Sequence, residues 1–297
     1  MRILITGGSG FLGSHIADEA TRRGYEVVML DRVPSPWLTV GQREVLGDIA
    51  DAGLLTEAMA GCDAVYHCAA IADLQKARQD PRAAIEVNVL GTLNVMQAAA
   101  SSGVGRLLHA SSVYVYSRSG SVYRTSKQAA ESLVSDLCGE LGLEVTILRF
   151  GSLYGPRADP DNAILRLTTQ AVRDRRIDFW GEGSEVREYI HIRDAAALAL
   201  DALASNYIGQ ALHIAGRERL TTRELIETIA ETLGGGIEIT YEDQPFEGRY
   251  RLTPFSHDEG LGRRIVSSTY IDLGLGLLEQ IRDISEIALA ENKGADS

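Results

Sequence analysis

The sequence predicts an α/β fold, in which a doubly wound parallel sheet is followed by a smaller mixed α/β domain. Short apolar runs rich in β-branched residues alternate with stretches of helical periodicity. A glycine-rich turn joins the first run to the first helical stretch, and the composition shifts after Phe150. Alternating strands and helices indicate βαβ units, whose right-handed crossovers cover both faces of a parallel sheet.

The elements of the first part are predicted from periodicity. Apolar runs with the composition of buried strands are Ile3 to Thr6, Val27 to Leu30, Ala64 to His67, Leu107 to Ala110 and Val145 to Phe150. Stretches with apolar residues at helical spacing are Phe11 to Arg23, Pro81 to Ser101 and Tyr123 to Leu141.

Glycine, proline, arginine and aspartate become frequent after Phe150, so we place a domain boundary there. Residues 1–150 form the predicted first domain. An apolar stretch from Tyr189 to Leu203, followed by Ala211 to Ile214, is predicted to return the chain to the first sheet, which assigns residues 189–215 to it. Residues 151–188 and 216–297 then form a second domain that closes over the site.

Composition excludes several classes of function. The 297 residues are 45% apolar and 24% charged, as in globular proteins generally, and the net charge of -12 argues against nucleic-acid binding. The three cysteines lack the spacing of a metal site and fit reduced thiols. A strand begins directly after Met1, and no apolar run is long enough to span a membrane. We therefore expect a cytoplasmic protein with no metal, membrane or nucleic-acid partner.

The glycine-rich turn has the sequence Gly7-Gly8-Ser9-Gly10-Phe11-Leu12-Gly13, with the spacing GxxGxxG. Glycines let backbone approach a pyrophosphate, and the N-terminus of the following helix stabilises its charge. Glycines also serve ordinary tight turns, so the turn alone is weak evidence. Its position between a strand and a helix favours a Rossmann-type dinucleotide site, in which the predicted contacts are Gly7, Gly10, Phe11, Leu12 and Gly13.

Asp31 ends the second predicted strand, at about the distance from the turn where an acid accepts hydrogen bonds from an adenosine ribose. A carboxylate there repels a 2′-phosphate and so favours NAD over NADP. The adjacent Arg32 weakens that preference, because a nearby arginine can accommodate a 2′-phosphate. We predict that NAD is the cofactor and that both residues contact it.

Tyr123 and Lys127 stand four residues apart, which places them on one face of a helix. The alternative is a surface or core tyrosine beside a solvated lysine. Lysine is rare in this chain, however, with three lysines among 29 basic residues, and Ser111 and Ser112 end the preceding strand. A phenol with a pKa near 10 must lose about three units, or roughly 4 kcal/mol, to act as a base at neutral pH. Lys127 and a positive nicotinamide ring would favour the phenolate.

These residues resemble the extended short-chain dehydrogenase/reductase superfamily, within its NAD-dependent epimerase/dehydratase family, which acts mostly on nucleotide sugars. The resemblance covers nearly the whole chain. Besides the turn and the Tyr123/Lys127 pair, it rests on the motifs at residues 47–49, 67–70, 88–92, 148–156 and 187–192.

The resemblance implies the remaining cofactor contacts. Asp48 and Ile49 would contact adenine, Ala69 and Ala70 would line the cofactor, and Asn88 would steady the strand beside it. Phe150, at the end of a predicted strand, is also expected at the cofactor.

The catalytic and substrate residues follow in the same way. Ser112 matches the family's catalytic Ser/Thr, which completes a predicted set of Ser112, Tyr123 and Lys127. The predicted substrate contacts are Ser111, Ser112, Ser152 in place of a family Asn, Arg187 at the pyrophosphate, and Arg249 or Arg251 as a second phosphate-binding arginine.

Two departures from the family pattern bear on the reaction. Dehydratases and decarboxylases of the family carry an acidic residue after the catalytic Ser/Thr, where this chain has Val113 and Tyr114. Ser112 and Tyr123 are only eleven residues apart, whereas most relatives insert a longer loop. Because this acidic residue is missing, dehydration and decarboxylation are less favoured than a reaction that needs only one acid/base.

The leading hypothesis is a nucleotide-sugar epimerase that acts at C4 of a UDP-sugar through a 4-keto intermediate, with tightly bound NAD. One alternative is an NAD-dependent sugar dehydrogenase or 4-keto-sugar reductase, and another is a non-catalytic NAD-binding protein. The stretches Pro81 to Ser101 and Tyr123 to Leu141 carry small and apolar residues on more than one face. In this family such helices resemble a four-helix dimer interface, so we expect a homodimer.

Overall fold

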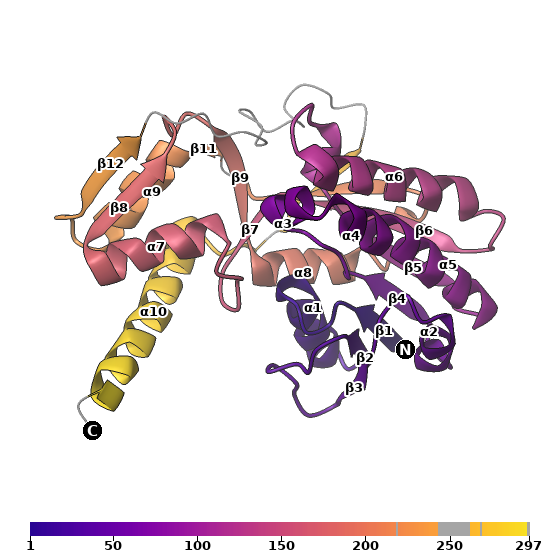
Figure 1. Cartoon of the computed structure of the whole chain (residues 1–297). Helices are drawn as coiled ribbons and strands as arrows, with labels where there is room; N and C mark the ends of the chain where they lie inside the picture. Colours follow the sequence, from indigo (N-terminus) through magenta and orange to yellow (C-terminus); the bar gives the residue numbers. More distant parts are fainter. Residues whose placement is uncertain (218, 243–261, 268, 296–297) are drawn as a thin grey trace.

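The computed structural model describes residues 1–217, 219–242, 262–267 and 269–295. A large α/β part holds an eight-stranded sheet in the order β13-β10-β6-β5-β4-β1-β2-β3, and a smaller part holds sheets of three and two strands. Figure 1 shows the smaller part beside one end of the larger one, with the C-terminal end of α10, a helix of the smaller part, projecting from it. The predicted fold class is confirmed.

All neighbouring strands of the large sheet are parallel. They are β1 (Arg2–Thr6), β2 (Glu26–Asp31), β3 (Gln42–Leu46), β4 (Ala64–His67), β5 (Arg106–Ser112), β6 (Glu144–Phe150), β10 (Ala211–Ile214) and β13 (Arg263–Ile265). The sequence did not predict β3 or β13, the two edges of the sheet. Edge strands bury less of their surface, and β3 consists of the polar sequence QREVL with no fully buried residue.

Helices cover both faces of this sheet. Helices α1 (Phe11–Arg22) and α8 (Ile192–Asp201) pack together on one face, where Ile3 and Ile5 of β1 point. Helices α2 (Ala52–Met59), α5 (Gly91–Ser101) and α6 (Ser121–Leu137) cover the other face, where Leu4 points. This alternation along β1 is that of a strand buried on both sides.

The predicted helix over residues 81–101 is divided. Helix α3 (Leu74–Gln79) is followed by α4 (Pro81–Ile85), a π-helical turn η1 (Glu86–Leu90) and then α5. Pro81 stands at the start of α4, where its missing N–H costs nothing. Asn88 lies within the π-helical turn, a feature that often marks functional sites.

The smaller part has its own core, which includes Tyr154, Leu167, Phe179, Ile226 and Leu277. Its strands are β7 (Ser152–Tyr154), β8 (Arg176–Trp180), β9 (Val186–His191), β11 (Arg219–Thr221) and β12 (Glu238–Glu242), and its helices are α7 (Ala163–Asp174), α9 (Thr222–Thr232) and α10 (Leu273–Ala295). A short turn, η3 (Ser205–Tyr207), follows α8 in the large part.

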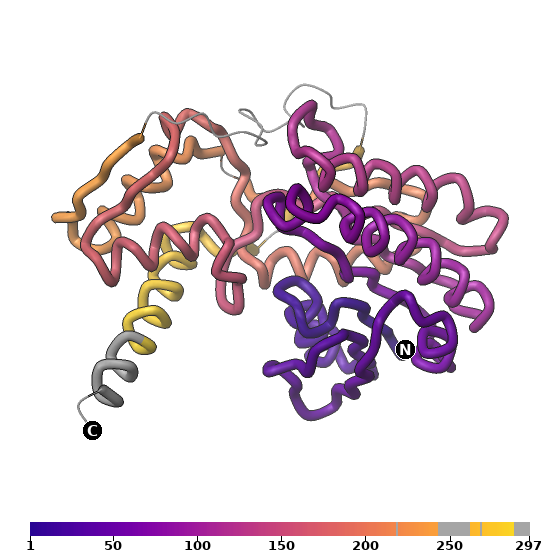
Figure 2. Tube along the Cα trace, in the orientation of Figure 1, coloured from indigo at the N-terminus to yellow at the C-terminus, as the bar shows by residue number. Residues whose placement is uncertain are grey.

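The trace in Figure 2 shows that the chain passes between the two parts more than once. It leaves the large sheet after β6, forms β7, α7, β8 and β9, and returns through α8 to β10. It then builds β11, α9 and β12, and β13 lies again in the large sheet. Among the described residues, none of the helices combines the length and apolar character needed to cross a membrane.

Candidate active site

The glycine-rich turn joins β1 to α1 and needs glycine for two separate reasons. Gly7 has a φ of +71°, and a Cβ on it would lie 2.7 Å from the backbone nitrogen of Ala69. A Cβ on Gly13 would lie 2.1 Å from the carbonyl oxygen of Gly7. The turn therefore packs tightly against its own helix and leaves backbone facing outward at the helix N-terminus, as a pyrophosphate requires.

Asp31 ends β2 beside this turn. Its Oδ2 accepts a hydrogen bond from the Ser9 backbone N–H at 3.0 Å, and its Oδ1 accepts one from the Arg32 N–H at 2.7 Å. The Arg32 guanidinium lies 3.6 Å from Asp48 Oδ2, in an exposed ion pair. The carboxylate that would bind the ribose is therefore fixed by backbone, and Arg32 already has an acidic neighbour.

A cavity of about 370 Å³ extends from this turn to the end of β5. Every predicted cofactor residue except Asn88 lines it: Gly7, Gly10, Phe11, Leu12, Gly13, Asp31, Arg32, Asp48, Ile49, Ala69, Ala70, Tyr123, Lys127 and Phe150. They come from the carboxyl ends of adjacent parallel strands, the usual place for a ligand in this fold. The glycine cradle and the donor set fit NAD.

Asn88 lies behind the cavity wall and is 1% exposed. Its side chain accepts a hydrogen bond from the Ile71 N–H at 2.7 Å and donates to the Ile71 carbonyl at 3.0 Å and to Ser126 Oγ at 2.9 Å. Asn88 therefore fixes the loop after β4 to helix α6, instead of touching the strand or the cofactor as predicted.

Ser112, Tyr123 and Lys127 meet at the inner end of the cavity. Ser112 ends β5, and Tyr123 and Lys127 project from α6, where both side chains are buried. The Lys127 ammonium donates to the Ala110 carbonyl at 2.9 Å. Between Ser112 and α6, the short turn η2 (Val113–Tyr116) places the Tyr114 ring edge-on to Tyr123, with centroids 5.9 Å apart.

Burial controls the ionisation of the two helical residues. It raises the pKa of Tyr123 to about 12, against the opposing effect of a hydrogen bond from Ser112. It lowers the pKa of Lys127 to about 8, although the neighbouring Cys68 and Glu131 favour the ammonium. The protein alone therefore raises the pKa of the phenol, which is the opposite of the lowering expected from the sequence.

A second cavity of about 350 Å³ lies beside the first. Both cavities are lined by Phe11, Ala72, Ser112, Gly151, Leu153 and Asp159, so they join at Ser112, the predicted catalytic serine. Ser152 of β7 and Arg187 of β9, both predicted substrate contacts, line the second cavity. An exposed ion pair joins Lys76 of α3 to Asp161 at 2.9 Å, and both residues line this cavity.

Two other substrate predictions have different outcomes. The Ser111 hydroxyl donates to Glu131 Oε1 at 2.5 Å, and Ser111 lines the first cavity and not the second. Arg249 and Arg251 lie outside the described residues.

Sequence reasoning missed several groups near the site. Glu185 lines the second cavity with a buried Oε2 that has no hydrogen-bond partner among the residues that the structure describes. Glu131 and Arg149 form a buried pair at 2.6 Å behind Ser111. Only Glu131 had a usable signal, because it follows Lys127 by four residues and so shares the catalytic face of the helix.

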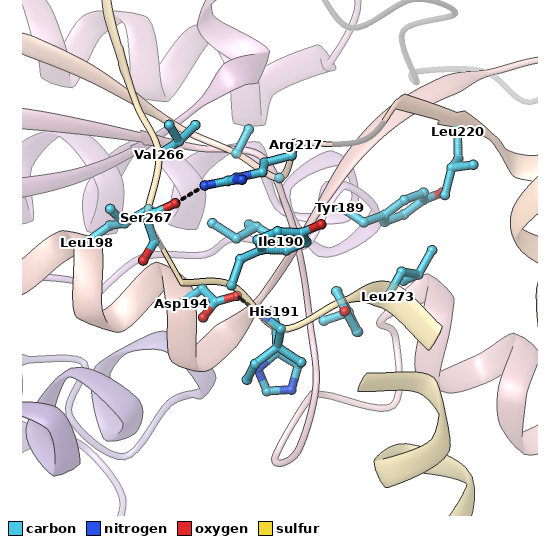
Figure 3. Close-up of a pocket in the computed structure, with 15 residues that line it drawn as sticks. Tyr189, Ile190, His191, Asp194, Leu198, Arg217, Leu220, Val266, Ser267 and Leu273 are labelled. Atoms are coloured by element: carbon cyan, nitrogen blue, oxygen red, sulfur yellow. Dashed lines mark hydrogen bonds between the residues drawn. The ribbon is translucent and has the colours of Figure 1, made fainter. Parts of the chain in front are cut away.

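A third cavity, of about 40 Å³, lies between β9, α8 and the segment that leads into α10 (Figure 3). Its polar groups are engaged in structural contacts. Asp194 accepts from the Ile271 N–H at 2.7 Å, Arg217 donates to the Ser267 carbonyl, and the Arg217 guanidinium lies 4.5 Å from the centre of the Tyr270 ring. This cavity joins the two parts of the molecule and lacks the glycine cradle and the acid/base residues of the first.

A dinucleotide cradle, a buried Ser/Tyr/Lys set and an adjoining cavity together define a short-chain dehydrogenase/reductase site. Residues 3–215 match the NAD dependent epimerase/dehydratase family. The chain belongs to this family and is an NAD-dependent enzyme of it.

Similar proteins carry different activities. A dTDP-glucose 4,6-dehydratase from Streptomyces antibioticus is 32% identical over 298 residues, covering 89% of this chain and 88% of that protein. A putative UDP-glucose 4-epimerase from Methanocaldococcus jannaschii is 28% identical, covering 84% and 88%. Among solved structures, MoeE5 in complex with UDP-glucuronic acid and NAD is 28% identical with a TM-score of 0.83, covering 97% of this chain and all of that one.

Proposed function

We propose that this enzyme is a nucleotide-sugar epimerase that inverts C4 of a UDP-sugar, using NAD that stays bound between turnovers. One observation carries the proposal. The turn η2, which lies between the catalytic Ser112 and the catalytic helix, consists of Val113, Tyr114, Val115 and Tyr116 and has no carboxylate. This segment then supplies no second acid/base beside Tyr123, and inversion through a ketone needs only one.

Each residue of the set has a defined task in this reaction. NAD, when bound, supplies reversible hydride acceptance and a positive charge beside the phenol. Tyr123 removes the proton of the C4 hydroxyl and later returns it, while Ser112 hydrogen-bonds the same oxygen. Lys127 holds the cofactor ribose and stabilises the phenolate. Tyr123 and Lys127 are buried, which excludes water from the proton transfer.

The second cavity supports a nucleotide sugar as the substrate. Arg187 lines it from β9 and is 8% exposed, so a phosphate bound to its guanidinium would be held in a largely desolvated place. Similar structures contain UDP-glucose or UDP-glucuronic acid together with NAD. We infer that the diphosphate binds near Arg187 and that the sugar extends toward Ser112, where the cavities join.

Dehydration is the second candidate, because six of the similar proteins are dTDP-glucose 4,6-dehydratases. Elimination needs a further acid/base beside the sugar. Within the second cavity the carboxylates are Asp73, Asp159, Asp161 and Glu185. Asp73 caps α3 and Asp161 pairs with Lys76, which leaves Asp159 and Glu185 as groups that could serve.

Product analysis separates the candidates. The purified holoenzyme is incubated with UDP-glucose, UDP-glucuronic acid or dTDP-glucose without added NAD, and products are identified by mass spectrometry and proton NMR. Epimerisation gives a product of unchanged mass with the C4 configuration inverted. Loss of one water indicates the dehydratase, loss of carbon dioxide a decarboxylase, and stoichiometric change in nicotinamide absorbance the dehydrogenase or reductase. An absence of C4 exchange with every sugar contradicts the epimerase.

We also propose that the enzyme is a cytoplasmic homodimer. The helical layer of α4, η1, α5 and α6 carries two large apolar side chains that stay exposed in the single chain, Ile85 at 38% and Leu90 at 51%. Light scattering of the holoenzyme at several concentrations tests the dimer, and Ile85→Glu with Leu90→Glu should then yield monomers.

A further inference from the structure

A buried ion pair lies directly behind the catalytic strand end. The Glu131 carboxylate and the Arg149 guanidinium are 2.6 Å apart, and their side chains are 10% and 13% exposed. Three hydrogen bonds connect them: from Arg149 Nη2 to Oε2 at 2.6 Å, and from Nε to Oε1 and Oε2 at 3.0 and 3.2 Å. The pair joins helix α6 to strand β6, the two elements beside β5.

The pair also hydrogen-bonds residues on both sides of Ser112. On the near side, the Ser111 hydroxyl donates to Glu131 Oε1 at 2.5 Å. On the far side, Arg149 Nη1 donates to the Tyr116 hydroxyl at 2.7 Å, and the guanidinium lies 4.7 Å from the centre of the Tyr116 ring. Ser112 is therefore held in a short segment, residues 111–116, whose two ends contact one ion pair.

Helix α6 places Glu131 in register with the catalytic residues. Tyr123, Lys127 and Glu131 follow one another at intervals of four, so they share one helix face. The distance along the helix from Tyr123 to Glu131 is thus fixed by the helix itself. Holding Ser111 on Glu131 consequently fixes the strand end, and with it Ser112, relative to Tyr123.

We propose that the Glu131–Arg149 pair is a positioning element for catalysis, which sets the Ser112 hydroxyl against the Tyr123 phenol. The proposal rests on the Ser/Tyr/Lys chemistry of the proposed function, and neither Glu131 nor Arg149 touches the reacting atoms. Only ten residues lie between Ser112 and Tyr123 in this chain. The pair ties that short connection to the scaffold at residues 111 and 116.

Stability alone does not account for this arrangement. A buried ion pair contributes little net stability compared with apolar residues of the same volume, because both ions lose hydration. Specific geometry is what such a pair provides, and here the geometry is applied at the two ends of the catalytic segment. A misplacement of about 1 Å in a reacting group can cost roughly 100-fold in rate.

Glu131→Gln is the informative change. The glutamine amide has nearly the same shape, but it carries no charge and replaces one carboxylate oxygen with an N–H donor, so the ion pair and the hydrogen bonds to that oxygen are lost. In the NAD holoenzyme, we expect kcat to fall roughly 10-fold to 100-fold with KM changed less than about threefold.

The pKa of Tyr123 gives a second readout that needs no sugar. Phenolate absorbance of the NAD holoenzyme is titrated against pH, with Tyr123→Phe as the blank. The groups that face Tyr123 are Ser112, whose hydrogen bond lowers its pKa, and Tyr114, whose charge raises it. Removing the negative charge of Glu131 would lower the Tyr123 pKa by a direct electrostatic effect. Displacing Ser112 would raise it, so the sign of the shift separates positioning from simple charge.

The decisive test repeats the change in a Ser112→Ala background. If Glu131 acts through Ser112, Glu131→Gln adds no further loss of kcat and no further pKa shift there. Additive effects, a downward pKa shift, or activity within about twofold of wild type each overturn the proposal. If the wild-type enzyme turns over none of the sugars, the proposed function is contradicted. The phenolate titration still tests the positioning role of the Glu131–Arg149 pair, because it needs no sugar.

Two further variants control for folding. Glu19→Gln is the matched control, because Glu19 is a carboxylate of similar exposure, 14%, that pairs with Arg22 and Arg23 far from Ser112. It should leave kcat and the Tyr123 pKa unchanged. Ser111→Ala removes only the hydroxyl that reaches Glu131 and leaves no charge unpaired. Ser111→Ala should raise the pKa of Tyr123 by a smaller amount than Glu131→Gln does. If Glu131→Gln loses NAD or fails to fold, Ser111→Ala tests the positioning role in its place.

Discussion

The two cavities that meet at Ser112 are lined by different kinds of structure. The cofactor cavity is formed by the ends of consecutive parallel strands, from Gly7 after β1 to Phe150 at the end of β6. The second cavity, which we propose holds the substrate, is lined by pieces of α3, η2, β7, α7, β8, β9 and α9, which are far apart along the chain. The shape of the first cavity is therefore set by the large sheet, whereas the shape of the second depends on how the smaller part packs against the larger one.

This difference determines how each side responds to change. On the cofactor side, backbone geometry does most of the binding, as at Gly7 and Gly13. On the substrate side, we propose that individual side chains such as Arg187 supply the contacts. Single substitutions should therefore cause large losses of NAD binding or activity on the cofactor side and smaller changes in KM on the substrate side. The largest effects are expected where the two cavities meet.

Tyr123→Phe should have the largest effect, because it removes the proposed acid/base, which lines the first cavity together with Ser112, a residue that both cavities share. We expect kcat to fall about 1000-fold, within the usual contribution of general acid/base catalysis. NAD content after purification, measured by release on denaturation, should be unchanged. Turnover retained at more than about a tenth of wild type would contradict the assigned chemistry.

Lys127→Met should separate stability from activity on the cofactor side. Burial lowers the pKa of Lys127 from its ordinary 10.5 to about 8, so the ammonium costs folding free energy at neutral pH, up to about 3 kcal/mol. Between these two pKa values the unfolded chain binds more protons than the folded one, and wild-type stability rises with pH.

The variant lacks this dependence. It should therefore be more stable than wild type at pH 7 and inactive, and its advantage should vanish as pH rises from about 8 to above 10.5. Chemical denaturation at a series of pH values measures the difference. A variant less stable than wild type at pH 7 would show that the hydrogen bond to Ala110 outweighs the burial of charge.

Gly13→Ala should weaken NAD binding about 100-fold, because the added methyl would lie 2.1 Å from the Gly7 carbonyl oxygen and must displace the turn. Gly139→Ala is the matched control, since a Cβ there meets nothing within 4 Å. Isothermal titration with NAD measures both. Equal affinities for the two variants would mean that the turn does not carry the pyrophosphate.

The same contrast explains what the sequence could predict. Strands buried on both faces, such as β1 and β4, gave continuous apolar runs, and the Gly7–Gly13 turn and the Tyr123/Lys127 spacing are local patterns. Edge strands β3 and β13 lack that signal because one side of each has no neighbour in the sheet. Asn88 was predicted at the cofactor, and its contact with Ile71 emerges only from tertiary structure.

The substrate side was less predictable for a physical reason. Glu185 and Asp159 reach their cavity only through the packing of the smaller part, and no local spacing links them to Ser112. Arg149 and Glu131 are 18 residues apart on different elements, and their pairing depends on α6 lying across β6. Family resemblance located Ser152 and Arg187 where periodicity could not.

Arg187→Ala should act on binding more than on chemistry. Loss of one charge-assisted contact to a diphosphate is worth about 1.5 to 2 kcal/mol, so KM should rise about 10-fold to 30-fold while kcat changes little. Arg176→Ala, on β8 of the same part, is the control, because that arginine is 47% exposed and pairs with Asp178. Initial rates over a range of nucleotide-sugar concentrations give both constants. A fall in kcat with constant KM would place Arg187 in the reaction step instead.

Lys76→Ala should have the smallest effect, although Lys76 joins the large part to the smaller one. Its ion pair with Asp161 is exposed, with side-chain exposures of 65% and 54%. Such pairs contribute between 0 and about 1 kcal/mol and are screened by salt. We expect KM to change less than about fivefold, and the change to shrink further as salt is raised. Asp161→Ala should match it, and the double variant should add nothing, because each single change already breaks the pair. A larger effect that persists in salt would mean that Lys76 contacts the substrate itself, and the gradual response expected of the substrate side would then fail at this residue.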